Sequence, residues 1–252
     1  MKGCHQPIWR SVAAAVAMLP VVALAQITVI SSGGFRVAYQ ELLPEFEHST
    51  GITVITGRGA SQGDGPNTIG AQLRRGVRAD VVIMSRQGLN DLMMEGRIRA
   101  GTDVDIAKVP LGVAVRAGAR KPDIRTVDAV KQALLQARSV AYESSTVPFM
   151  ENRLLPRLGI AAEIARKFVD AGPPALATGQ AEILIAPVSE ILHAPGADYV
   201  GVLPAEIQSI QTFSAAIVSG SGEVDASRRL IGFLASPNAR AAIDASGMES
   251  LR

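Results

Sequence analysis

Short apolar runs recur along this chain, each followed by a polar or glycine-rich turn. The runs are rich in Val and Ile and have the length of buried strands. The predicted strands are Ile27–Ser31, Ile52–Thr56, Asp80–Met84, Val109–Arg116, Arg138–Tyr142, Glu182–Ala186, Tyr199–Leu203 and Thr212–Val218.

Between these runs, apolar residues return every three or four positions, which is the pattern of amphipathic helices. The predicted helices are Phe35–Phe46, Asn67–Arg75, Leu89–Glu95, Val127–Ala137, Pro148–Leu158, Glu163–Val169 and Val224–Ala235. Pro44 predicts a kink or an early end in the first of them. Strands that alternate with helices in this way predict an α/β fold with open, mostly parallel sheets and helices on both faces.

Two of the predicted strands divide the chain into two lobes. Val109–Arg116 and Thr212–Val218 are long, and the residues between them form strand–helix units of their own. We expect these two strands to cross between the lobes as a two-segment hinge. The first lobe is then discontinuous, residues 26–108 plus 212–252, and the second lobe comprises residues 109–211.

The first 25 residues have the pattern of a signal peptide. A basic start precedes an apolar run, Val12–Leu24, which is too short to span a membrane, and Ala23-Leu24-Ala25 fits a small-residue cleavage site. Cys4 lies in this leader and no cysteine stands at the cleavage point, which argues against a lipid anchor. We therefore expect a soluble, monomeric protein in a bacterial periplasm that begins at Gln26.

Cleavage changes which kinds of chemistry remain open. It removes two of the 25 basic residues and none of the 23 acidic ones, so the mature chain has no formal net charge and nucleic acid is not an expected partner. The mature chain also lacks cysteine, which excludes disulfides, thiolate nucleophiles and cysteine-rich metal sites. His48 and His193 lie far apart in the sequence without a carboxylate cluster, so we expect neither metal nor cofactor.

Small hydroxyl residues and glycines follow the carboxyl ends of the predicted strands, where open α/β sheets bind their ligands. Ser31-Ser32-Gly33-Gly34, between the first strand and the first helix, is the clearest case. The free N–H groups at a helix N-terminus attract an anion, and small side chains let it approach. Arg58 and Arg86 follow two other strands and offer a two-pronged grip on a carboxylate or oxyanion. We predict an anion site at this edge.

The predicted ligand-binding residues are Ser32, Gly33, Gly34, Arg58, Ser61, Gln62, Ser85, Arg86, Ser144, Ser145 and Ser189. Taken singly, a serine before a helix is more often a plain N-cap than a ligand. Arg36 has the position of a solvated helix residue, and Glu190 that of a surface or capping group.

The stretches ITVISSGGFRVAYQELLPEFEHSTGITV, GRGAS and ADVVIMS resemble the periplasmic molybdate-binding protein superfamily, and the similarity extends over nearly all of the mature chain. This resemblance implies the type II periplasmic-binding-protein fold: two α/β lobes, a hinge of two crossing segments and an anion between the lobes. Two positions depart from the molybdate pattern. Gly34 stands where that pattern has a serine, and Ile185-Ala186-Pro187 provides no tyrosine.

A branch of this superfamily represented by periplasmic aconitate isomerase is more similar. The shared features are SSGG, GVAVRAGARKPDI, SVAYESS, AEILIAPVSEIL and VGVLPAEIQ. This resemblance implies cofactor-free transfer of a proton along an allylic system, which interconverts cis- and trans-aconitate. Removal of a proton beside a carboxylate requires a base and donors that stabilise the dienolate. Tyr142, Glu143 and Glu151 are the candidate bases, and the sequence does not choose among them.

A second class of function stays open at this point. The protein could instead be the substrate-binding component of an ABC importer, which would hold molybdate or a carboxylate unchanged and deliver it to a permease. The two arginines at strand ends, and the departures from the molybdate pattern, favour a carboxylate ligand over molybdate.

Overall fold

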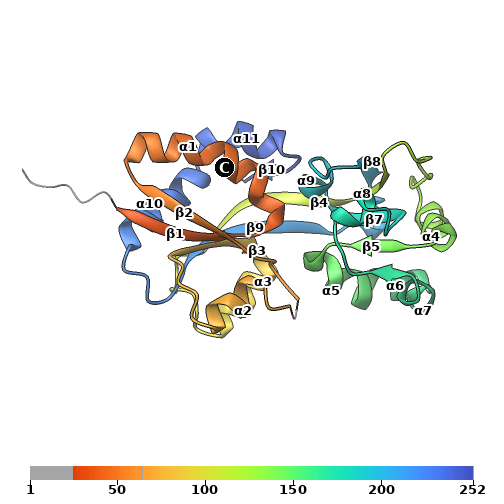
Figure 1. Cartoon of the computed structure of the whole chain (residues 1–252), viewed down its shortest axis with the longest axis horizontal. Coiled ribbons are helices and arrows are strands. Elements are labelled where there is room, and N and C mark those ends of the chain that lie inside the picture. Colours follow the sequence, from red (N-terminus) through yellow and green to blue (C-terminus); the bar gives the residue numbers. More distant parts are fainter. Residues whose placement is uncertain (1–24, 64, 252) are drawn as a thin grey trace, which may run out of the picture.

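The computed structural model describes residues 25–63 and 65–251, and the predicted signal peptide lies outside them. The fold is α/β and elongated, with two lobes side by side (Figure 1). Long strands β4 (Val104–Arg116) and β9 (Ile210–Ile217) run through the middle and connect the lobes. Within the described residues, no helix has the length and apolar character that a membrane span requires.

The first lobe contains a sheet with strand order β2-β1-β3-β9-β4, and β10 pairs with β4. The remaining strands of this sheet are β1 (Gln26–Ser31), β2 (Thr53–Arg58), β3 (Val81–Ser85) and β10 (Glu249–Ser250). β1 is parallel to both β2 and β3, whereas β9 is antiparallel to β3 and to β4. The carboxyl ends of β1, β2 and β3 therefore meet at one edge.

The second lobe continues the same order through β4-β7-β5-β6, while β8 pairs with β4. Its strands are β5 (Val140–Tyr142), β6 (Phe168–Val169), β7 (Ile183–Pro187) and β8 (Ala197–Val202). β5 is parallel to β6 and β7, and β4 is antiparallel to β7 and β8. β1, β2 and β3 are thus mutually parallel, as are β5, β6 and β7, as expected. The strands that join the lobes, and β8 and β10 beside them, pair antiparallel, so the sheet is mixed.

β4 changes partners at the junction between the lobes. Up to Pro110 it pairs with β9, and from Leu111 onward it pairs with β7 and β8. The Gln208 side chain secures this point, because its Oε1 accepts from Leu111 N–H at 2.9 Å and its Nε2 donates to the Leu111 carbonyl at 3.1 Å. This change of partner supports our proposal that the lobes comprise residues 26–108 plus 212–252 and residues 109–211.

Helices cover both faces of the first lobe. One face packs under α1 (Arg36–Thr50), α10 (Val224–Leu234) and α11 (Arg240–Ala245), and the other under α2 (Ile69–Arg74) and α3 (Arg86–Met94). α1 continues past Pro44 to Thr50, so the helix does not end early. Pro44 is exposed, and the carbonyl that loses its helical partner there can bond to water.

The second lobe follows the same plan with shorter helices. Its helical segments are α4 (Val127–Gln136), α5 (Val147–Phe149), a π-helical turn (Met150–Leu154), α6 (Leu155–Leu158), α7 (Ala161–Ala165), α8 (Pro174–Ala177) and α9 (Val188–Ile191). α4 to α7 pack on one face, and α8 and α9 on the other. The predicted helix Glu163–Val169 is wrong in its second half, because Phe168 and Val169 pair with β5 as an edge strand.

Candidate functional site

A cavity of about 430 Å³ lies between the lobes, at the carboxyl ends of β1, β2 and β5. Its lining residues are Ser31, Ser32, Gly33, Arg36, Arg58, Gly59, Ala60 and Asn67 from the first lobe and Glu143 from the second. The sheet edge at which the sequence predicts an anion site therefore borders a cavity. Three of the predicted ligand-binding residues and one predicted base line it together.

The turn after β1 presents donors that have no partner among the described residues. Ser32 is buried, and its Oγ finds no hydrogen-bond partner among the described residues. The short 3-10 helix η1 (Gly33–Phe35) leads from this turn into α1, and the N–H groups of Gly33 and Gly34 also find no acceptor in the described part of the chain. A buried hydroxyl and helix-start N–H groups without acceptors are what an anion would satisfy.

The two glycines of this turn are small for different reasons. A Cβ on Gly34 would overlap the ring of Phe213 in the core, so the absence of a side chain there serves packing. This corrects the interpretation that Gly34 is small to let a ligand approach. A Cβ on Gly33 would meet only the carboxyl group of Glu190, at 3.6 to 3.8 Å. Gly33, which is exposed, therefore keeps the approach to the turn open.

Two arginines that line the cavity are free to bind an anion. Arg36 and Arg58 form no ion pair with an acidic residue in the described part of the chain, and Arg36 makes one hydrogen bond of 3.3 Å, to Gln40. Arg58 was predicted from the sequence. Arg36 was not, because its helical position is equally that of a solvated residue. The structure shows that Arg36, at the start of α1, lines the cavity.

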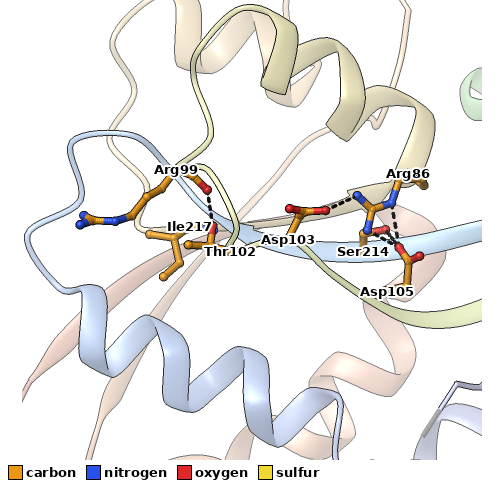
Figure 2. Close-up of polar contacts among 7 residues, drawn as sticks. All are labelled: Arg86, Arg99, Thr102, Asp103, Asp105, Ser214 and Ile217. Atoms are coloured by element: carbon orange, nitrogen blue, oxygen red, sulfur yellow. Dashed lines mark hydrogen bonds and ion pairs between the residues drawn. The ribbon is translucent and has the colours of Figure 1, made fainter.

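Arg86 has a different environment, shown in Figure 2. Its Nη1 donates to Asp103 at 2.7 Å, and its Nε and Nη2 donate to Asp105, whose carboxylate also accepts from Ser214 Oγ. The two carboxylates raise the pKa of the Arg86 guanidinium, and Arg86 in turn lowers the pKa of Asp103. This cluster joins the start of α3 to β4 and β9, so the geometry indicates a structural role for Arg86.

Glu143 is the predicted base that reaches the cavity. Its Oε2 accepts from the N–H of Ser145 at 2.6 Å and from the Ser145 hydroxyl. Ser145 is held in turn by Gln211 of β9, whose Nε2 donates to the Ser145 carbonyl at 3.2 Å. The carboxylate is thus oriented by its own loop, and that loop is bonded to the hinge strand.

The comparisons with known proteins agree with this two-lobed arrangement. The sequence profile of the bacterial extracellular solute-binding protein family matches residues 27–249. The chain belongs to this family. An aconitate isomerase from Pseudomonas sp. is 35% identical over 241 residues, which covers 94% of this chain and 92% of that protein.

Solved structures of solute-binding proteins share the fold. The periplasmic molybdate-binding protein of Azotobacter vinelandii has a TM-score of 0.66 at 20% identity, over 88% of this chain and 98% of that chain. The sulfate-binding protein of Mycobacterium tuberculosis has a TM-score of 0.69 at 18% identity, over 90% of this chain and 87% of that chain. The predicted type II binding-protein fold is confirmed by these matches.

The other two predicted bases of this solute-binding protein lie away from the cavity. Tyr142 is buried in the core of the second lobe, where its ring stacks on Phe168 at a centroid distance of 4.2 Å. Its hydroxyl donates to Glu151 Oε1 at 2.8 Å, and burial together with this bond raises the pKa of Tyr142. Neither residue lines the cavity, so the geometry favours Glu143 among the three.

Several predicted serines have structural partners. Ser85 is the N-cap of α3 and accepts from Gly88 N–H, and Ser61 Oγ accepts from Ser85 N–H at 3.0 Å. Gln62, Ser85, Arg86 and Ser145 line a smaller cavity of about 290 Å³ next to the hinge. Ser144 belongs to the turn η2 (Ser144–Thr146). Ser189 of α9 is buried, and its Oγ finds no partner in the described residues.

Proposed function

We propose that this protein is an aconitate isomerase, which interconverts cis- and trans-aconitate in the cavity between its lobes by cofactor-free proton transfer. The observation that supports this most directly is the placement of one oriented carboxylate, Glu143, in the same cavity as Arg36 and Arg58. Neither guanidinium group forms an ion pair among the described residues. The 35% identity to the aconitate isomerase of Pseudomonas sp. over nearly the full length supports the same conclusion.

The donors at the site suit a ligand with several carboxylates. Arg36 and Arg58 each offer a two-pronged grip on one carboxylate. A third carboxylate fits the turn after β1, where the Ser32 hydroxyl and the N–H groups of Gly33 and Gly34 find no acceptor in the described part of the chain. We keep the ligand role for Arg58 and assign to Arg36 the role predicted for Arg86.

The reaction then needs one base and a set of hydrogen-bond donors. Glu143 removes a proton from the methylene carbon of cis-aconitate, and the electron pair of the broken C–H bond spreads over the neighbouring double bond and carboxylate as a dienolate. Donors already in place stabilise this charge as it forms. Glu143 returns the proton to the carbon that was vinylic, so the double bond moves one position and the base is regenerated. The conformation in which the ligand is held decides between cis and trans products.

The alternative is a binding protein for an importer, with molybdate or a related anion as cargo. The hydroxyl and N–H donors of the first turn support it, since such groups also bind tetrahedral oxyanions. Glu143 argues against it, because molybdate has no carbon-bound proton for a base to remove, whereas aconitate has one. In either case we propose that the mature protein begins at Gln26 and works in the periplasm as a monomer. Only the importer function would require a permease as a partner.

Two measurements on the purified mature protein distinguish the functions. The isomerase reaches the same ratio of cis- to trans-aconitate from either starting isomer, as followed by proton NMR. The importer component leaves both isomers unchanged, and calorimetry then shows tight binding of molybdate or of one carboxylate. Tight molybdate binding without aconitate turnover would refute the proposed activity.

A further inference from the structure

Glu190 lies at the point where the two lobes meet over the turn after β1. It belongs to α9 of the second lobe, and α9 contacts η1 of the first lobe. Its two carboxyl oxygens lie 3.6 and 3.8 Å from the position that a Cβ on Gly33 would occupy. The carboxyl group is therefore the nearest neighbour of Gly33, an exposed glycine whose N–H finds no acceptor among the described residues. Gly33 follows Ser32, whose hydroxyl is buried, in the sequence.

The Glu190 carboxyl group has no hydrogen-bond or ion-pair partner among the residues that the structure describes. Val188, Ser189 and Ile191 of the same helix are buried, whereas Glu190 keeps a partly exposed surface. β4, β7, β8 and η1 pack against α9, and the charges that act on Glu190 are those of Glu143 and Arg36. A carboxyl group without a partner among the described residues thus lies beside Gly33, which lines the cavity.

Burial raises the pKa of Glu190 well above its ordinary value, and the negative charge of Glu143 raises it further, while the nearby Arg36 acts in the opposite direction. When two carboxyl groups share a site, the charge of one disfavours ionisation of the other, so one is often ionised while the other stays protonated. Glu143 Oε2 accepts hydrogen bonds from the N–H and the hydroxyl of Ser145, whereas Glu190 accepts none from the residues that the structure describes. The proton therefore belongs on Glu190.

We propose that Glu190, in its protonated form, is a catalytic hydrogen-bond donor that stabilises the dienolate oxygen together with the turn after β1. This inference rests on the proposed isomerase function. The O–H of Glu190 donates to the carboxylate oxygen on which charge accumulates after Glu143 has removed the carbon-bound proton. No proton passes from Glu190 to carbon, so Glu190 is unchanged at the end of each turnover.

Two substitutions separate this role from other roles. Glu190→Gln keeps a donor of the same shape that cannot ionise, and Glu190→Leu keeps the volume but removes the donor. We expect the Gln variant to retain most of the wild-type kcat and to lose the decline in activity at high pH that ionisation of Glu190 causes. We expect the Leu variant to bind aconitate with little change and to lose about 10²- to 10³-fold in kcat, the usual effect of removing one such donor.

An infrared difference spectrum of wild type minus Glu190→Gln tests the protonation state without any turnover. A protonated-carboxyl band at neutral pH that is absent in the Gln variant supports the proposal, and its absence from the wild type refutes it. Wild-type kcat in the Leu variant, or an equal loss in both variants, also overturns it while the isomerase function stands. If the Leu variant does not fold, the pH profile of the Gln variant and the infrared band decide. A wild type that does not convert aconitate refutes the proposed function itself.

Discussion

The ring of Phe213 occupies the place that a side chain on Gly34 would need. Both residues belong to the first lobe, and Phe213 is fully buried there. The neighbouring Gly33 has room, because its nearest contact would be the Glu190 carboxyl group at 3.6 Å. We predict that Gly34→Ala lowers the free energy of unfolding by about 1–3 kcal/mol, the usual cost of overpacking a core. Urea unfolding measures this loss.

Gly33→Ala is the matched control for that change. It adds the same methyl group one residue earlier, at ordinary van der Waals distance, so stability should be nearly unchanged while aconitate binds more weakly. Equal stabilities for the two variants would show that Phe213 does not restrict Gly34. Unchanged binding in Gly33→Ala would show that the ligand does not approach this turn.

The arginines that line the cavity should contribute to binding. Replacement of Arg36 or Arg58 by Ala should weaken aconitate binding by about 1.5–3 kcal/mol, or about ten- to a hundredfold, because a charge-assisted hydrogen bond is lost. Replacement by Lys should restore part of the affinity, since a point charge does not reproduce the two-pronged grip. Calorimetry measures each Kd.

Arg86→Ala provides the contrast. Its guanidinium is bonded to Asp103 and Asp105, so the variant should lose stability rather than affinity. The expected loss is about 1.5–3 kcal/mol, the range for hydrogen bonds to charged groups. Wild-type stability with a large loss of affinity would return Arg86 to the ligand set that the sequence predicted.

The sequence was sufficient for the fold class because the strand–helix alternation is local. Each predicted strand from Ile27–Ser31 to Thr212–Val218 corresponds to an observed one, within a few residues at the ends. Short elements such as β6, β10, α8 and α9 were not predicted, because tertiary contacts rather than their own pattern hold two- to four-residue segments. Segment length, not hydrophobicity, limited the prediction.

The site could be predicted only in part, for a different reason. Ser32, Gly33 and Arg58 follow strand ends, and sheet topology alone places them at one edge. The role of Arg36 and Glu190 depends on how the second lobe sits over the first, which no local pattern records. The aspartate partners of Arg86 lie 17 and 19 residues away in the sequence, so its involvement in an ion-pair cluster was equally hidden.

The three predicted bases should separate cleanly when each is changed. Tyr142→Phe removes the hydroxyl that donates to Glu151, so it should cost about 1–2 kcal/mol of stability and leave aconitate turnover unchanged. Glu143→Gln keeps the shape and removes the base, so turnover should fall by at least about a hundredfold with aconitate still bound. Steady-state kinetics measure turnover, and calorimetry measures binding. Loss of turnover in Tyr142→Phe with normal turnover in Glu143→Gln would indicate that the base is the Tyr142–Glu151 pair.

Glu190 should make the stability of the protein depend on pH. In the folded chain its pKa is raised above the ordinary value of 4.5. Between pH 4.5 and the raised pKa, the folded state therefore binds more protons than the unfolded state. Stability should therefore fall as the pH rises through this window, by up to about 1.4 kcal/mol per pH unit from this group. Glu190→Gln should lack this contribution. If the free energy of unfolding has the same pH dependence in the wild type and in Glu190→Gln, the pKa of Glu190 is not raised in the folded chain.

The most direct test of the account is the fate of cis-aconitate when it is incubated with the purified mature protein and followed by proton NMR. We predict that trans-aconitate appears with the wild type and with Tyr142→Phe, without added metal or cofactor, and that Glu143→Gln produces almost none. The contradictory result is binding of cis-aconitate, seen by calorimetry on the same sample, with no trans-aconitate formed by the wild type.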